Sequence, residues 1–211
     1  MPFASDPLFS VAHALRVKGF AEGPAVAEAT GHPPDRALAL LAELAETELV
    51  ERRDRGITGW RLTTEGRKTH ESWLNNERVA AGCDTEIAAG YDTFVLRNEE
   101  FKVLCTDWQM RTVGGELVPN DHADEAYDAA IVDRLGVLHE TVVPSVAALA
   151  EALARFGPYS ARLTSACGRV REGDRSAIAR PLSGSYHDVW MELHQDLLLT
   201  LGRERGDADG H

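Results

Sequence analysis

The pattern of apolar and polar positions over the first 75 residues predicts three short helices followed by a two-stranded hairpin. Apolar residues recur at three- and four-residue steps in the helical segments, and Gly and Pro residues separate these segments. A polar, glycine-bearing turn separates two short runs of strand-forming residues. The expected elements are helices over 8–20, 25–29 and from 34 onward, strands over 49–53 and 60–62, and a further helix from Thr64 to about Arg78.

Beyond this point the pattern becomes helical throughout. One apolar stripe over 87–111 predicts a long helix, or two helices broken at Asn98. A loop containing Gly and Pro follows at 113–120, and a second long helical segment spans 121–156, where Pro144 should introduce a kink or a break. Two further helices are expected over 159–171 and 185–201.

The order of these elements predicts two units of a mainly α protein. Three helices followed by a hairpin is the order of a winged helix-turn-helix, so we expect that fold over 1–75, with a wing of two or three β-strands. Residues 76–205 are predicted to form an all-α helical bundle that dimerises or binds an effector, and 206–211 a disordered tail.

Charge and composition narrow the class of protein. The chain has 211 residues and a net charge of −12, of which residues 1–75 contribute −2 and residues 76–211 the remaining −10. Any affinity for nucleic acid must therefore come from local clusters of cations. The chain has no run of about 18 apolar residues, so no membrane span is predicted, and its first residues do not resemble a secretory signal. The three cysteines form no CxxC pair, so we expect a cytoplasmic protein with no membrane partner.

The segments LLAELAETELVERR and GWRLTTEGR, within residues 40–67, resemble the MarR-type winged-helix regulators. The positions that match that family's pattern are Leu41, Leu44, Leu49, Val50, Asp54, Arg55, Leu62, Thr63 and Gly66. The resemblance implies a dimeric transcription regulator that binds double-stranded DNA. The chain departs from the pattern at Glu48, where the family has glycine, so we expect either backbone strain there or a different helix end.

Two groups of polar residues are the candidate DNA contacts. The start of the third helix offers His32, Asp35 and Arg36, and among these Arg36 is suited to a bidentate contact with guanine. The hairpin offers a basic cluster suited to the phosphate backbone, Arg52, Arg53, Arg55 and Arg61, and Thr58 in its turn is a further candidate contact. Three carboxylates in and after the same helix, Glu43, Glu46 and Glu48, would repel phosphates if they faced DNA.

The C-terminal bundle contains candidates for a small-molecule pocket. These are aromatic or polar residues placed on apolar helices: Asn98, Trp108, Tyr127, His139, Tyr186, His187, Trp190 and His194. His139, His187 and His194 are also weak candidates for metal ligands, although their spacing matches no known ligand motif and we expect no cofactor. An all-helical effector domain behind a winged helix is similar in architecture to GntR-type regulators.

The leading hypothesis is a DNA-binding transcription regulator that is not an enzyme. The chain has no GxSxG, GxGxxG or phosphate-loop motif. Two alternatives stay open. One is a helical enzyme or metal-binding protein with a winged-helix appendage, and the other is a winged-helix adaptor that binds another protein.

Overall fold

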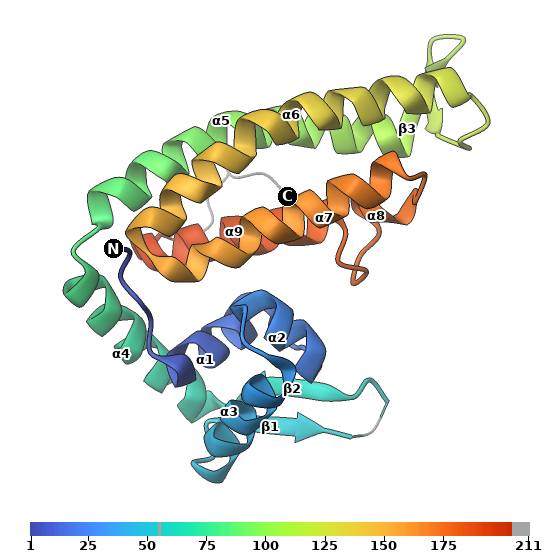
Figure 1. Ribbon diagram of the computed structural model, residues 1–211. Helices are drawn as coiled ribbons and strands as arrows, with labels where there is room; N and C mark the ends of the chain where they lie inside the picture. Colours follow the sequence, from blue (N-terminus) through green and yellow to red (C-terminus); the bar gives the residue numbers. More distant parts are fainter. Residues whose placement is uncertain (55, 204–211) are drawn as a thin grey trace.

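The computed structural model describes residues 1–54 and 56–203 (Figure 1). Arg55 and the predicted disordered tail at 206–211 lie outside the described residues. The helices are α1 (Pro7–Lys18), α2 (Gly23–Thr30), α3 (Pro34–Glu46), α4 (Thr64–Ala81), α5 (Asp84–Gln109), α6 (Glu125–Ala152), η1 (Ala154–Phe156), α7 (Gly157–Arg171), α8 (Ser176–Ala179) and α9 (Tyr186–Leu201). The strands are β1 (Val50–Arg53), β2 (Gly59–Leu62), β3 (Met110–Val113) and β4 (Glu116–Pro119).

Helices α1, α2 and α3 and the β1–β2 hairpin share one hydrophobic cluster. The inner face of α3 contributes Leu40, Leu41 and Leu44, each no more than 1% exposed, while its other face is open to solvent. The two strands are antiparallel, and Trp60 of β2 also exchanges both backbone hydrogen bonds with Ala21, at 2.8 and 3.0 Å. This isolated antiparallel β-bridge joins the hairpin to the segment between α1 and α2.

The junction between α3, the hairpin and α4 is tightly packed. Glu48 has a φ of 57°, a left-handed conformation, so of the two expected outcomes at this position the structure has backbone strain. Thr63 caps α4 by accepting a hydrogen bond from the Gly66 backbone N–H, as the sequence predicts. A Cβ atom on Gly66 would lie 1.9 Å from the carbonyl oxygen of Leu49, so only glycine fits here.

The remaining residues form a helical bundle. Helices α5 and α6 pack along each other, α7 packs on α6, and α9 packs against α5 and α7. A second hydrophobic cluster runs between these helices and includes the fully buried side chains of Leu135, Tyr186 and Trp190. α5 is one continuous helix through Asn98, and α4 continues past the predicted unit boundary at 75 to Ala81.

The prediction that the second unit is all-α is wrong in one segment. Residues expected to form a loop fold instead as the hairpin β3–β4, which projects from the far end of α5 (Figure 1). The turn is Gly114–Gly115, and both residues have positive φ values, 61° and 91°. Two glycines between short strand-forming runs are a hairpin signal, which the prediction of a loop over 113–120 leaves out.

α6 differs from its expected form because Pro144 neither splits it nor ends it. The helix runs to Ala152, and the 3-10 turn η1 follows where the prediction had continued the helix to Phe156. By length and composition α6 is the one helix in the described ranges that could cross a membrane, with a mean hydropathy of 1.2 over 18 residues. Its apolar face packs in the bundle cluster.

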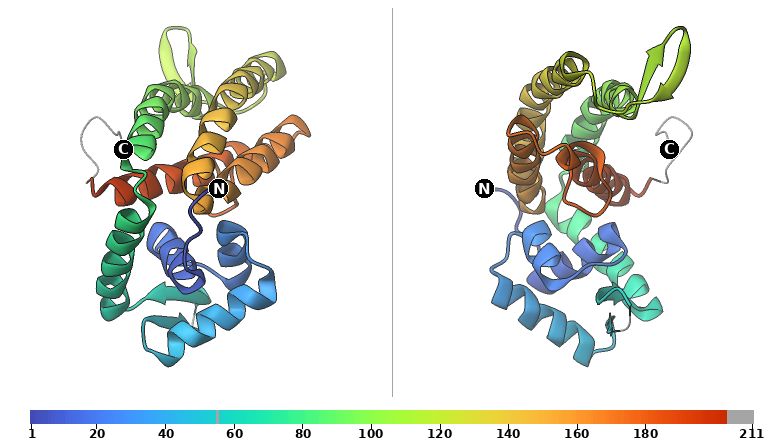
Figure 2. Two further views of the ribbon diagram at one scale, coloured as in Figure 1. Left: turned by 60° about the vertical axis from the view of Figure 1, so that its left-hand side comes forward. Right: turned by 90° about the vertical axis from the view of Figure 1, so that its right-hand side faces the viewer.

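Helices α1, α2 and α3 and the β1–β2 hairpin form what we call the three-helix unit. This unit and the bundle lie at opposite ends of the molecule, and α4 connects them (Figures 1 and 2). The chain before α1 provides a second connection, because Phe3 exchanges backbone hydrogen bonds with Ala152 and Ala154 beside η1. The side chain of Phe3 packs against the bundle cluster. The three-helix unit is therefore attached to the bundle at both of its ends.

Candidate functional site

The outer face of α3 lies at the end of the molecule away from the bundle, and the β1–β2 hairpin extends to one side of it (Figure 1). Ile57, at the hairpin tip, lines a groove that bundle residues also line. Asp35 and Arg36 are exposed at the start of α3, where the sequence placed them. Arg53 and Thr58 are exposed on the hairpin. The hydrophobic cluster holds one face of α3, so the opposite face is free to meet a partner.

The described arginines of this surface differ in their contacts. Arg52 pairs with Asp54 at 2.8 Å and Arg61 with Glu51 at 2.6 Å, and each of these side chains is about half exposed or more. Exposed ion pairs of this kind contribute little to stability, so each arginine can exchange its carboxylate partner for a phosphate. Arg36 and Arg53 make no ion pair within the described residues. Arg55, the fifth predicted cation of this surface, is outside the described residues.

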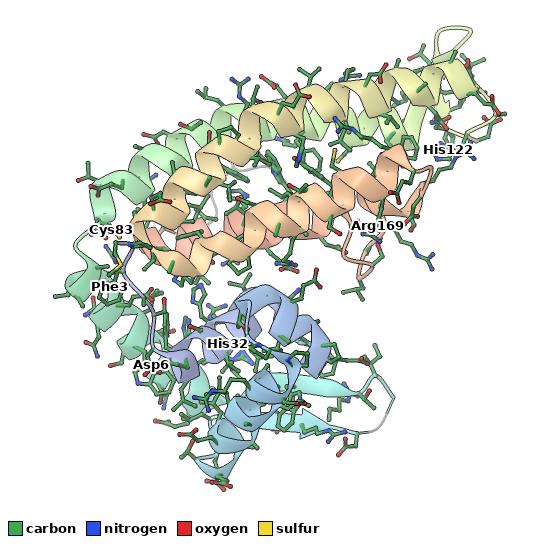
Figure 3. The ribbon with its side chains drawn as sticks, viewed as in Figure 1. Phe3, Asp6, His32, Cys83, His122 and Arg169 are labelled. Atoms are coloured by element: carbon green, nitrogen blue, oxygen red, sulfur yellow. The ribbon has the colours of Figure 1, made fainter. Side chains whose placement is uncertain are left out.

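His32 has a different position from the one that the sequence interpretation proposed. Its side chain turns toward the bundle, as Figure 3 shows, and lines a cavity of about 180 Å³ between α1 and the bundle. Its Nε2 atom is buried without a hydrogen bond in the described structure. Burial, and then the nearby charge of Arg36, lower the pKa of the imidazole. His32 is therefore not part of the exposed surface of α3.

The eight candidate pocket residues of the bundle do not gather around one cavity. Trp190 donates a hydrogen bond from Nε1 to Asn98 Oδ1 at 2.8 Å, and its indole packs at a tilt against the rings of Phe94 and Phe101. Tyr186 and His194 belong to the same core, and His139 packs edge-on against Tyr186. Only His187 of this set lines one of the two larger cavities, and Trp108 and Tyr127 lie at the far end of the bundle beside β3.

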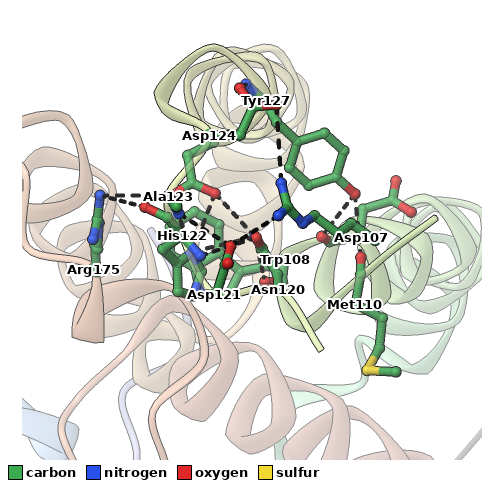
Figure 4. Close-up of polar contacts among 12 residues, drawn as sticks. Asp107, Trp108, Met110, Asn120, Asp121, His122, Ala123, Asp124, Tyr127 and Arg175 are labelled. Atoms are coloured by element: carbon green, nitrogen blue, oxygen red, sulfur yellow. Dashed lines mark hydrogen bonds and ion pairs between the residues drawn. The ribbon is translucent and has the colours of Figure 1, made fainter. Parts of the chain in front are cut away.

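Trp108 and Tyr127 belong to a polar cluster that ties β4 to α6 and α8 (Figure 4). His122 Nδ1 lies 3.0 and 3.1 Å from the two oxygens of Asp128, and Asn120 donates to the same carboxylate at 3.0 Å. Burial would raise the pKa of Asp128, but the hydrogen bonds from Asn120 and His122 outweigh it and the pKa is lowered.

An aspartate–histidine pair can serve in acid–base catalysis when it activates a nucleophile. Neither ring nitrogen of His122 hydrogen-bonds to Ser, Thr or Cys within the described ranges. The cluster instead holds the end of the hairpin: Arg175 reaches the His122 carbonyl at 3.3 Å, and the indole of Trp108 packs on the His122 ring.

A second polar cluster, which we call the interface network, lies between the three-helix unit and the bundle. Arg155 of η1 is at its centre, with its side chain 6% exposed. The guanidinium pairs with Glu77 of α4 at 2.9 Å and with Asp196 of α9. His13 of α1 has its Nε2 atom 3.0 Å from Asp196 and 3.1 Å from Arg155, and its Nδ1 atom 2.9 Å from His70 Nε2.

The environment of the interface network keeps both histidines neutral. Burial, followed by the charge of Arg155, lowers the pKa of His13. Burial and the neighbouring His13 lower the pKa of His70 to about 3. Burial alone would raise the pKa of Asp196, but Arg155 and His13 reverse this and hold the carboxylate ionised. The network therefore links two units through one buried arginine and two buried carboxylates.

One cavity borders this network, and a second lies next to the first. The 180 Å³ cavity reaches His13, Arg155 and Asp196. A larger groove of about 750 Å³ opens between α2, the hairpin tip, α9 and the segment that precedes α9. Lys18 and Glu192 line both spaces and form an ion pair at 2.5 Å that bridges α1 and α9.

Sequence reasoning missed this region, although a signal was present. Asp196 lies between the apolar residues Leu193 and Leu197 of α9, and Arg162 lies one position before Leu163 on the buried face of α7. A charged residue within an apolar stripe requires a partner or a ligand.

Among the described residues, no group of three or more His, Cys, Asp or Glu side chains is arranged to hold a metal ion.

No family model, no curated protein and no solved structure matches this chain. The function must therefore be argued from the chain's own surfaces and cavities.

Proposed function

We propose that the protein is a DNA-binding transcription regulator, with a winged helix-turn-helix over 1–75 and a helical bundle that dimerises, binds an effector, or both. The observation that carries the proposal is the position of α3 and the hairpin. α3 has one face in the core and the other exposed at an end of the molecule, next to a hairpin with exposed arginines. This arrangement is suited to a helix in the major groove and a hairpin on the backbone.

The charges on α3 determine which end would enter the groove. Arg36 is exposed in the first turn and can bond to the O6 and N7 atoms of guanine. Glu43 and Glu46 are exposed further along the helix and would be repelled by phosphates. The N-terminal end of α3 therefore approaches the bases, and the hairpin arginines contact the backbone. A homodimer would present two such helices to a near-palindromic site.

The proposal is tested by fluorescence anisotropy of labelled DNA from upstream of the protein's own gene, compared with random DNA, at two salt concentrations. We expect tighter binding to the upstream DNA by roughly a hundredfold or more. Arg53→Gln should weaken binding to both DNAs and reduce the magnitude of the salt slope by about 1. Arg36→Gln should weaken binding mainly to the upstream DNA, by about 1–3 kcal/mol. Arg171→Gln removes an exposed charge from the bundle and serves as the matched control.

Equal effects of Arg53→Gln and Arg171→Gln on the salt slope would contradict the proposed position of the hairpin. No binding of either DNA at low salt would contradict the proposal as a whole.

A protein-binding adaptor is the second candidate, and the acidic side chains on α3 favour it. Glu43, Glu46 and Glu48 are all exposed, so this face would also suit a basic protein surface. The same titrations separate the two functions: a lack of DNA binding at low salt, together with a stable partner in a pull-down that Glu43→Lys abolishes, would favour the adaptor.

A further inference from the structure

The 750 Å³ groove has apolar walls that come from both units of the molecule. Phe20 and Ile57 line it from the three-helix unit, and Leu182 and Met191 from the bundle. Ile57 is 70% exposed and Leu182 is 94% exposed, so two large apolar side chains stand open to solvent at the same groove. A volume of about 750 Å³ lies within the range of small-molecule sites. The groove can therefore hold an organic molecule with a large apolar body.

Leu182 has a strained backbone at the edge of this groove. Its φ is 57°, in the left-handed region that favours glycine. The carboxylate of Asp188 fixes the loop, because it accepts hydrogen bonds from the backbone N–H groups of Leu182 at 3.3 Å and Ser183 at 2.9 Å. The strain and the exposure of an apolar side chain both lower the stability of the free protein. A ligand that covers Leu182 would offset part of this cost.

The charges along the groove favour a cation. Both cations among its described lining residues already pair with Glu192, Lys18 at 2.5 Å and Arg162 at 2.7 Å. Burial lowers the pKa of His187, so this residue adds no positive charge at neutral pH. Four described lining residues are carboxylates, and against the two cations they leave a net charge of −2: Glu22, Glu28, Asp188 and Glu192.

Two of these carboxylates, at the start of α2 and within it, have no close cationic partner in the described structure. Glu22 accepts a hydrogen bond from the Thr58 hydroxyl at 3.3 Å. Glu28 lies 3.7 Å from Arg162 Nε, beyond hydrogen-bond distance. Both glutamates are exposed, so each keeps carboxylate oxygens free for a ligand. Exposed charges contribute modestly to affinity, so the apolar walls would supply most of it and the carboxylates would select the sign of the ligand's charge.

We propose that this groove binds an organic cation with a large apolar body, which packs along Phe20, Leu182 and Met191 while its positive charge lies near Glu22 and Glu28. Because the groove has one wall on each unit, the bound cation bridges the three-helix unit and the bundle. An effect of the cation on DNA affinity rests on the function proposed above, whereas binding of the cation does not.

Isothermal titration of the full chain with tetraphenylphosphonium tests the site. Tetraphenylborate, which has the same shape and the opposite charge, is the control ligand. We expect saturable one-to-one binding of the phosphonium, and binding of the borate that is weaker by at least about tenfold. Glu22→Gln and Glu28→Gln should each weaken phosphonium binding by about threefold. Glu43→Gln, at an exposed position of α3 outside the groove lining, should leave phosphonium binding unchanged.

Leu182→Gly separates a ligand contact from a structural role. Glycine relieves the positive φ, so the variant should unfold at a higher urea concentration than the parent protein. The same change removes an apolar contact, so phosphonium binding should weaken by at least about threefold. Weaker binding by a more stable protein cannot result from loss of folding.

Three results would each overturn the proposal: absence of saturable phosphonium binding, equal affinity for the phosphonium and the borate, or a phosphonium affinity that is the same in the parent protein and in the variants at Glu22, Glu28 and Leu182. These titrations contain no DNA, so their failure and a failure of DNA binding are separate results.

Discussion

The buried histidine pair makes the stability of the protein dependent on pH, and His70 allows this dependence to be measured. His70 is 0% exposed, its Nε2 atom is 2.9 Å from His13 Nδ1, and its ring stacks on those of Phe9 and His13. Its pKa is lowered from 6.5 to about 3 by burial and by the neighbouring charges. The folded state therefore resists protonation of this ring in the range where the unfolded chain accepts a proton.

The sign of the effect follows from this difference in pKa. Below about pH 6.5 the unfolded chain binds a proton at position 70 and the folded chain does not, so acidification favours unfolding. The loss continues until the pH approaches the folded pKa of about 3. At 1.36 kcal/mol per unit, we expect His70 alone to remove about 2 kcal/mol of unfolding free energy between about pH 8 and pH 5. His13 contributes in the same direction because its pKa is also lowered.

The measurement is urea unfolding, followed by circular dichroism, at several pH values between about 8 and 5. His70→Gln replaces the ring with an amide that can bond to His13 but does not titrate. We expect the variant to lose about 2 kcal/mol less than the parent protein over this range. Glu71→Gln, at the next and exposed position of α4, should follow the parent protein.

Asp196 does not interfere with this test. Its pKa is lowered, so its stabilising contribution is lost only below the pKa of an unfolded aspartate, about 3.9. The reasoning is refuted if His70→Gln and the parent protein lose the same free energy between about pH 8 and pH 5.

Four further substitutions at three positions test the packing, each measured by urea unfolding at neutral pH. Arg155→Met should cost about 3–5 kcal/mol because it leaves two buried carboxylates without their shared cation, and a loss below about 1 kcal/mol would contradict the interface network. Gly66→Ala should cost more than about 3 kcal/mol, since its Cβ would lie 1.9 Å from the carbonyl oxygen of Leu49. Glu48→Gly should stabilise the protein by about 0.5–1 kcal/mol because its φ is 57°, whereas Glu48→Ala should give no gain.

Local sequence signals predicted the helices and their ends well. Thr63 caps α4 as expected, and the apolar face of α3 is buried as its periodicity indicates. Ser185, predicted as the first residue of the last helix, is the N-cap of α9. These features depend on neighbours a few residues away, so they can be recognised in the chain itself. The Gly114–Gly115 hairpin was missed although its signal is equally local.

The surroundings of the buried polar residues depend on contacts between distant parts of the chain, which no local sequence pattern shows. His32 lies two positions before α3 in the chain, yet it lines a cavity together with the distant residues Arg155 and Asp196. Arg162 is buried by α9, whose Glu192 lies 30 positions further on, and by α1. The sequence shows that such residues are polar members of an apolar face, but only the packing of the helices shows which partners and cavities they meet.

The two attachments of the three-helix unit define how that unit can move. Phe3 and Cys83 stand at its two ends, both belong to the packing of the bundle cluster, and Figure 3 draws them at the same corner of the molecule. A swing of the unit about that corner would have to break the contacts that join α1 to the bundle, which are those of His13 with Asp196 and Arg155 and the Lys18–Glu192 pair. Because α3 lies on the side of the unit away from the bundle (Figure 1), the release of these contacts would turn a small change at the interface into a larger displacement at α3.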